Sequence, residues 1–487
     1  MTKLNAQQFF LNLQQLTTTL SHSNKYLIAY SGGVDSHVLL HLCATLNTSD
    51  FSAVYINHGL SPNAKQWGLH AQQICADLDI PFTSIEVDGK ANKGQSPEAA
   101  ARIARYNALK PLVTTNTYLL TAQHQDDQAE TLLLQLLRGS GVKGLSAMPR
   151  MKPFGKGFLC RPLLDYSKQN LLTYAQEYQL SWIEDESNKE QCFDRNYLRH
   201  TIFPLLEEHW PKVRENFAKS AEILAESQSV LDKSAFLESQ KLFPIDEQGD
   251  IEYNKLLIKP ALDLINKDNT FLEKSHRFAQ LNNVLRYWIT LNNFALPSKK
   301  VLEQIVYNVL LAKEDAMPLV KWQHEESYCE LRRYQNKLYL LHSSLITHKQ
   351  QYKQLNNDQS VELSDHSCVQ CIRSENTDNQ HSFEAKILFS QMVTIRFRQG
   401  GERFRRNAQQ PSHKLKHWFQ EQAIPPWERD QIPLIFWGEE LIQIGNTVVS
   451  DSVSDSVSDS LKEAQKNNAF DEPVQIVWQK SAIVRNK

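Results

Sequence analysis

Long apolar segments are missing from this sequence. No run of about 18 apolar residues occurs in its 487 residues, so no transmembrane helix is predicted. The segment from Met1 to Leu20 is rich in Gln and Thr and predicts an amphipathic helix rather than a signal peptide. Seven cysteines, an odd number without regular spacing, form no disulfide framework and predict a reducing, cytoplasmic setting. The net charge of −2 indicates no partner, so a nucleic acid would need local basic patches.

Two common nucleotide motifs are also missing. An apolar stretch, Tyr26 to Tyr30, predicts a buried strand, and the helical period resumes from His37 to Cys43. The glycine turn between them has no Gly-Lys-Ser/Thr, which excludes a Walker loop. It also lacks the third glycine and the later ribose-binding acid of a dinucleotide fold.

The turn itself predicts a phosphate site. Two adjacent glycines let the backbone approach a ligand, and the free amides and positive dipole end of the helix favour an anion there. The sequence SGGVDS after a first strand is the pattern of ATP pyrophosphatases, which split ATP into AMP and pyrophosphate. A glycine-rich turn without a ligand is the alternative. The predicted ATP-binding residues are Ser31, Gly32, Gly33, Val34, Asp35 and Ser36.

Strand and helix patterns then alternate, which predicts an α/β domain with a doubly wound parallel sheet. The expected strands after the first are 51–57, 83–87 and 118–122, and the expected helices are 64–78, 97–109 and 126–137. In such sheets ligands bind beyond the carboxyl ends of the strands. The polar residues at those ends are Asp35, His58, Asp88, His124, Asp126 and Asp127.

One helix start carries several acids. His124 ends a predicted strand, and Asp127 and Glu130 lie one turn apart on the next helix. Mg²⁺ binds few protein oxygens together with phosphate oxygens, so Asp35 and Asp127 are the predicted magnesium ligands. Alternatively, the acids only complement the helix dipole.

The remainder predicts further domains. We expect a catalytic domain at 1–215, a mainly helical domain at 216–345, a polar linker at 346–382 and a mixed α+β domain at 383–487. A Ser-Asp-Ser-Val repeat at 450–460 predicts a disordered loop. A single Cys-x-x-Cys, Cys368 to Cys371 with His366 nearby, is incomplete as a zinc site.

A basic patch lies in the last domain. The segment from Arg396 to His417 contains seven Lys and Arg residues and a single acidic residue, Glu402. Aromatic residues are interleaved with them. Phosphate contacts and stacking on RNA require this combination; a solvated basic face is the alternative. The seven residues are Arg396, Arg398, Arg403, Arg405, Arg406, Lys414 and Lys416.

Several motifs together resemble the tRNA(Ile)-lysidine synthase family. They are SGGVDS, SPEAAARIARY, AQHQDDQAET, LLRGSGVKGLSAM, DESN…DRNYLR and the C-terminal run from Phe397 to Ile435. The chain departs from the family at Gln123, where members often have a second histidine.

The resemblance implies a reaction. ATP and Mg²⁺ would adenylate O2 of the wobble cytidine in the CAU-anticodon isoleucine tRNA, and free L-lysine would then attack C2. The candidate catalytic residues are Asp35, His124, Asp127, Glu130 and Arg105, and the domains at 216–345 and 383–487 would bind tRNA. Arg138 and Lys143 suit a phosphate of the anticodon loop, or they belong only to a glycine cap and turn. Arg195 and Arg199 either contact the tRNA or brace the domain junction.

The sequence leaves alternatives open. A tRNA thiolase or a GMP or NAD synthetase would share the loop, and a non-catalytic tRNA-binding protein would need only the fold. No Cys-x-x-Cys occurs in the first 215 residues, which disfavours a thiolase. The oligomeric state stays open, a homodimer included.

Overall fold

The computed structural model divides into two compact units, Met1–Lys233 and Ser234–Lys487. The structure describes residues 4–17, 24–46, 50–59, 61, 63–90, 97–184, 194–245, 251–266, 271–313, 316–324, 327–342, 353–356, 360–363, 367–373, 383–384, 388–389, 391–405, 411–446, 448–450 and 473–479. The predicted catalytic domain ends at 215, near the start of helix α10 (Val213–Ser239), whereas the units divide inside that helix. None of the helices among these residues is long and apolar enough to cross a membrane.

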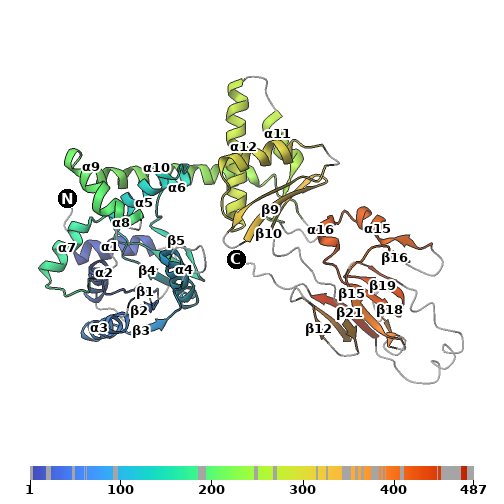
Figure 1. The fold of residues 1–487 in the computed structure, drawn as a ribbon, viewed down its shortest axis with the longest axis horizontal. Helices are drawn as coiled ribbons and strands as arrows, with labels where there is room; N and C mark the ends of the chain where they lie inside the picture. Colours follow the sequence, from blue (N-terminus) through green and yellow to red (C-terminus); the bar gives the residue numbers. More distant parts are fainter. Residues whose placement is uncertain are drawn as a thin grey trace. The chain divides into compact units, whose positions relative to one another are not determined.

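The first unit is built on a six-stranded sheet in the order β3-β2-β1-β4-β6-β5 (Figure 1). The strands are β1 (Lys25–Ala29), β2 (Phe51–Asn57), β3 (Phe82–Glu86), β4 (Thr117–Leu120), β5 (Met151–Phe154) and β6 (Gly157–Cys160). Five are parallel, and β5 pairs antiparallel with β6 at the edge. The predicted α/β class is confirmed. The β5–β6 hairpin was not predicted, because Pro153, Gly155 and Gly157 interrupt its apolar pattern.

Helices cover both faces of this sheet. On one face, a core that includes Phe9, Leu39 and Leu171 joins α1 (Ala6–Thr17), α2 (Val34–Ala44), α3 (Ala64–Asp77) and α7 (Lys168–Glu177) to the strands. On the other, Leu109 at the end of α4 (Pro97–Leu109) and Val113 pack on Leu119 and Leu159. The helices after β4 are α5 (Gln125–Leu137), α6 (Val142–Leu145), α8 (Asp194–Tyr197) and α9 (Phe203–His209), with π-helical Leu198–Ile202 before α9.

The second unit begins with helices on a four-stranded antiparallel sheet in the order β7-β10-β9-β8. Its core contains Trp288, which is fully buried, and Leu331. Strands β9 and β10 form a hairpin in the middle of this sheet. The elements are β7 (Lys255–Leu257), α11 (Ile258–Asn266), α12 (Phe271–Leu291), α13 (Lys299–Gln304), π-helical Ile305–Leu310, β8 (Leu319–His324), β9 (Ser327–Tyr334) and β10 (Lys337–His342).

The predicted linker at 346–382 is wrong where the structure describes it. It contains β11 (Lys353–Leu355), β12 (Ser360–Glu362) and β13 (Cys368–Arg373), which join the C-terminal sheets β11-β15-β18-β19-β20 and β12-β13-β21-β14. Because the segment is rich in polar residues, the alternation of buried and exposed side chains along these strands was not recognised. On β13, for example, Val369 and Cys371 are buried. The other elements are β14 (Phe383–Glu384), β15 (Val393–Arg396), β16 (Arg403–Phe404), β17 (His413–Lys414), α15 (Leu415–Glu421), α16 (Pro426–Arg429), β18 (Leu434–Trp437), β19 (Glu440–Ile444), β20 (Val448–Val449) and β21 (Pro473–Gln479).

The Cys-x-x-Cys pair lies on β13. Residues three apart on a strand point to opposite faces, and accordingly Cys371 is buried while the Cys368 thiol contacts Gln479. This geometry does not let both sulfurs bind one metal ion. His366 and the repeat at 451–460 lie outside the described residues.

Candidate active site

The glycine turn connects β1 to α2 as predicted. Gly32 has a φ of +83°, which favours glycine, and an added Cβ would lie 3.1 Å from Cδ1 of Ile183. Gly33 is the N-cap of α2, so the first helical amides lie beside the turn. Ser31 and Ser36 meet there, with hydroxyl oxygens 3.1 Å apart, and Ser36 also donates to the Gly33 carbonyl at 2.9 Å. The two serines therefore hold the loop in a closed turn at the start of α2.

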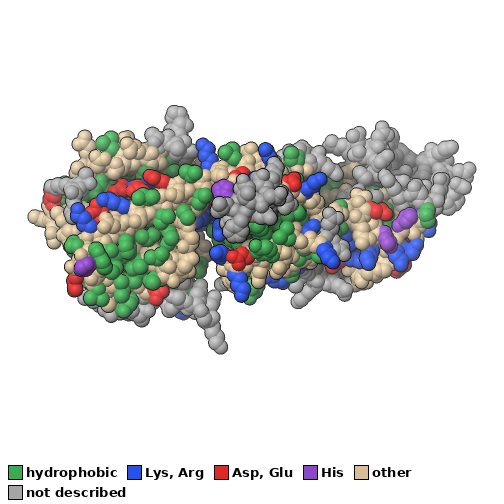
Figure 2. Space-filling model, turned by 90° about the horizontal axis from the view of Figure 1, so that it is seen from above, with side chains coloured by type: hydrophobic (Ala, Val, Ile, Leu, Met, Phe, Trp, Pro, Cys, Tyr) green, Lys and Arg blue, Asp and Glu red, His purple; other side chains and the backbone are tan. Residues whose placement is uncertain are grey.

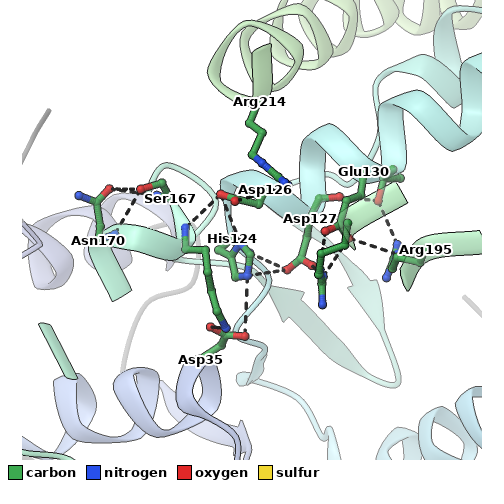
Figure 3. A network of polar contacts seen from close by, with 12 residues as sticks. Asp35, His124, Asp126, Asp127, Glu130, Ser167, Asn170, Arg195 and Arg214 are labelled. Carbon is green, nitrogen blue, oxygen red and sulfur yellow. Dashed lines mark hydrogen bonds and ion pairs between the residues drawn. The ribbon is translucent and has the colours of Figure 1, made fainter. Parts of the chain in front are cut away.

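His124 is the centre of the acidic cluster (Figure 3). It is the N-cap of α5, is 3 % exposed, and its backbone N–H donates to the Asp127 carboxylate at 3.1 Å. Its Nε2 lies 3.7 Å from Asp35 and 3.6 Å from Asp127, and its Nδ1 lies 3.9 Å from Asp126. The structure thus brings together residues from the ends of β1 and β4, as predicted.

Lys168 is a site residue that the sequence analysis missed. Its Nζ donates to Asp35 Oδ1 at 2.6 Å, and its backbone N–H donates to Asp126 at 3.0 Å. Ser167 and Asn170 cap each other at the start of α7 and thereby direct the first amide of the helix at Asp126. That capping pair is visible in the sequence, but nothing there connects Lys168 with Asp35.

A second charged group surrounds Glu130, which is fully buried. Arg199 donates to both Glu130 oxygens, at 2.7 and 2.9 Å, and to Asp127 at 3.1 Å. Arg195 lies 3.8 Å from Glu130 and donates to Thr131. The structure therefore places Arg195 and Arg199, predicted as tRNA contacts, as braces of the carboxylates.

Asp127 and Glu130 on α5 differ in the direction of their pKa shifts. Burial raises the pKa of Glu130, and the hydrogen bonds from Arg199 oppose this only in part. Burial would also raise the pKa of Asp127, but the neighbouring His124 and Arg199 outweigh it and lower the pKa. Neighbouring carboxyl groups whose pKa values are driven apart are suited to different roles. Asp127 is the one that stays ionised as a ligand for cations.

Asp126 is held by a further arginine that was not predicted. Arg214 on α10 lies 3.7 Å from Asp126, donates to Glu207 at 2.6 Å and stacks on the Phe203 ring. Asp126 is therefore held by the first amide of α7 and by an ion pair with Arg214.

Asp35 and Asp127 fit a magnesium ion. Both carboxylates approach the same His124 nitrogen, and Asp127 is ionised. No cluster of three or more His, Cys, Asp or Glu side chains suited to a metal occurs in the described part of the chain. Mg²⁺ in nucleotide sites is commonly bound by one or two carboxylates, and phosphate oxygens and water supply its other ligands.

Three other predicted residues have exposed side chains. Arg105 is exposed on α4. Arg138 is 63 % exposed and lies 3.9 Å from Asp194, and Lys143 is exposed on α6. Gly139, with a φ of +68°, follows the C-cap Arg138 and ends α5.

The C-terminal basic patch is partly engaged in folding. Arg396 stacks on Phe436 at 3.7 Å, Arg398 lies 3.4 Å from Asp430, and Arg403 donates to Ser412. Figure 2 shows Lys, Arg and His side chains gathered on this part of the chain. Arg405, Lys414 and Lys416 are exposed, and Arg406 lies outside the described residues.

Comparisons with known proteins agree with this organisation. A PP-loop domain model matches residues 5–206, a TilS substrate binding domain model matches 275–339, and a TilS substrate C-terminal domain model matches 393–463. A solved structure of a TilS C-terminal domain covers 27 % of this chain and 98 % of its own at 16 % identity, with a TM-score of 0.21. That likeness is too weak to support an argument.

Curated relatives cover almost the whole chain. The tRNA(Ile)-lysidine synthase of Coxiella burnetii is 40 % identical over 89 % of this chain and 91 % of its own length. That of Legionella pneumophila is 37 % identical over 89 % of this chain and 93 % of its own length. That of Methylococcus capsulatus is 34 % identical over 90 % of this chain and 94 % of its own length. The relatives are ligases and do not favour the thiolase alternative. The chain belongs to the tRNA(Ile)-lysidine synthase family.

Proposed function

We propose that this enzyme ligates L-lysine to C2 of the wobble cytidine, position 34, in the CAU-anticodon isoleucine tRNA. ATP would first adenylate O2 of the base with release of pyrophosphate, and lysine would then displace AMP. The observation that carries this proposal is the convergence of Asp35, His124 and Asp127 beside the glycine turn. A phosphate cradle and carboxylate side chains at one sheet edge suit transfer of an adenylyl group.

The glycine turn would hold the phosphates that leave. The first amides of α2 and the hydroxyl groups of Ser31 and Ser36 would receive the pyrophosphate oxygens. Mg²⁺ on Asp35 and Asp127 would neutralise charge that develops on the phosphates. Lys168, which already contacts Asp35, would add a positive charge on the same side. The oxygen of a cytosine is a poor leaving group, and adenylation makes C2 electrophilic.

The second step requires an amine without its extra proton. Glu130, one turn from Asp127, is fully buried and both of its oxygens accept from Arg199, so it would serve this step by holding Arg199 beside Asp127. His124, between three carboxylates, is suited to orient the base or the α-phosphate. Arg105 stays a proposed contact to substrate from α4.

The tRNA would bind through exposed cations. We assign this role to Arg138 and Lys143 in the first unit and to Arg405, Lys414 and Lys416 in the second. Lysidine formation by this route predicts AMP and pyrophosphate as products in equal amounts.

The test is mass analysis of the nucleosides of a CAU-anticodon isoleucine tRNA after incubation with enzyme, Mg²⁺, ATP and lysine. One cytidine should gain the mass of lysine with loss of water. An isoleucine tRNA with another anticodon is the control and should stay unchanged. Conversion of ATP into ADP, or unmodified RNA with every amino acid, would refute the proposal.

A further inference from the structure

A cationic cluster that the mechanism does not use lies between α4 and the β5–β6 hairpin. It consists of Arg102, Lys152 and Arg161. Arg102 lies 5.1 Å from the centre of the Tyr106 ring, and Arg161 is close enough to the same tyrosine to interact with it electrostatically. Tyr106 in turn packs against Phe154 of β5, with ring centres 5.7 Å apart. Tyr106 therefore lies beside both arginines, and Lys152 lies on β5, two residues before Phe154.

No carboxylate neutralises this cluster within the part of the chain that the structure describes. Partial burial of its side chain lowers the pKa of Lys152, which is exposed at the surface, and Arg161 and Arg102 lower it further. Arg161 is 3 % exposed; it donates to the Pro149 carbonyl at 2.6 Å, and its Nε has no hydrogen-bond partner among these residues. Three cations that repel one another without a counterion form a site with affinity for an anion.

The cluster stands at the edge of the sheet where the reaction is proposed. Arg161 directly follows β6, which is parallel to β4, and β4 is parallel to β1. The carboxyl ends of these strands therefore share one edge. The glycine turn follows β1, His124 follows β4, and Arg161 follows β6 in the same order across the sheet.

The site is separate from the phosphate cradle. Helix α2, which starts at the glycine turn, packs in the core on one face of the sheet, whereas Leu109 at the end of α4 packs in the core on the other face. Strand β4 also lies between the strands that carry the two sites. An ATP molecule bound by the glycine turn would have its phosphates at the end of β1. Its phosphates would therefore not occupy the cationic cluster beside β6.

We propose that Arg102, Lys152 and Arg161 form a phosphate-binding site for the tRNA backbone beside the nucleotide that is modified. The exposed Arg102 and Lys152 would contact phosphate oxygens, and the buried Arg161 would supply charge from behind them. This site deepens the proposed function and rests on it for the identity of the RNA. It anchors the RNA at the reaction edge, in addition to the basic patch of the second unit.

The test replaces the two exposed cations in the full-length enzyme, as Arg102→Gln with Lys152→Gln. The matched control is Lys110→Gln with Lys156→Gln. These lysines are also exposed, belong to the same region, and lie at the opposite strand ends, because Lys156 precedes β6 and Lys110 follows α4. Both double variants lose the same charge, and equal thermal unfolding profiles would show that both fold.

Binding of the CAU-anticodon tRNA is measured against NaCl concentration. Each lost phosphate contact lowers the salt slope of the binding constant by about 0.7 to 0.9. The slope of the cluster variant should therefore fall by about 1.5, while the control keeps the wild-type slope and ATP affinity without RNA is unchanged. Equal slopes for both double variants would overturn the proposal, and so would lower ATP affinity with unchanged RNA binding.

The design also separates this inference from the proposed function. If the wild-type enzyme leaves the cytidine unmodified but its tRNA binding depends on Arg102 and Lys152, the site stands and the reaction is wrong. If lysidine forms and the cluster variant binds tRNA as the control does, the reaction stands and the site is wrong.

Discussion

Lys168 Nζ lies 2.6 Å from Asp35 Oδ1, which joins the start of α7 to the end of the glycine turn. Both side chains are about one-third exposed, so the pair lies at the opening of the site rather than in the core. The contribution of this ion pair to the free energy of unfolding is therefore small. Its importance lies in the charge that it places beside the phosphates.

Replacing this lysine should impair the first chemical step. Lys168→Met keeps the backbone N–H that binds Asp126 but removes the charge beside Asp35. Loss of one preorganised electrostatic contact should lower the rate of pyrophosphate release by about 100-fold. Lys168→Arg should recover part of this loss. Lys219→Met, which removes an exposed lysine on α10, is the control, and an equal rate for all variants would contradict the assignment.

The glycine turn offers a paired test of backbone geometry. Gly32→Ala forces a residue with a Cβ into a φ of +83° and brings that Cβ within 3.1 Å of Ile183, at a cost of about 1–2 kcal/mol. Gly33→Ala is the control, since Gly33 has a φ of −75° and its nearest contact would be 3.8 Å away. Gly32→Ala should therefore lose more ATP affinity, measured by calorimetry. Equal ATP affinities of the two variants would show that the turn does not contact ATP.

Asp127 can be tested without disturbing its helix. Asn at this position still accepts the hydrogen bond from the His124 backbone, but it lacks the ionised charge. Asp127→Asn should reduce pyrophosphate release by at least about 1,000-fold, because a metal ligand is lost, and should leave tRNA binding nearly intact. Normal pyrophosphate release would remove Asp127 from the site.

Local patterns were sufficient to predict the centre of the site. Asp35, His124 and Asp127 each stand at a strand end or helix start, and the parallel sheet brings such positions to one edge. The partner of Asp35 was not predictable in this way, because Lys168 is 133 residues away and one cation among 53 carries no distinguishing signal. The strands at 353–373 were missed because polar residues fill their exposed faces.

The pair of Glu130 and Arg199 should stabilise the first unit. Glu130→Gln leaves a guanidinium group beside Asp127 without its main partner, and loss of these charge-assisted hydrogen bonds should cost about 2–3 kcal/mol. Arg138→Gln removes one partner of the exposed 3.9 Å pair with Asp194 and should cost less than about 1 kcal/mol. Hydrogen exchange of the α5 amides measures both variants. Equal protection in the two variants would contradict the bracing role.

The first unit should lose stability in mild acid through His37. This residue is 3 % exposed, and burial, with help from His41 and His70, lowers its pKa from 6.5 to about 4. The unfolded chain therefore binds the proton at a higher pH than the folded chain. The contribution of His37 to the free energy of unfolding is fully present above pH 6.5. It falls by about 3 kcal/mol as the pH drops toward 4.

The variant His37→Gln isolates this contribution, because all other titrating groups are common to both proteins. Native-state hydrogen exchange of the β1 amides gives the opening free energy of the first unit alone, which avoids the mixed unfolding of a multidomain chain. Whatever the variant costs at pH 7, the wild-type protein should lose about 3 kcal/mol more than the variant between pH 7 and pH 4. Parallel pH profiles would mean that His37 does not enter the folded core uncharged.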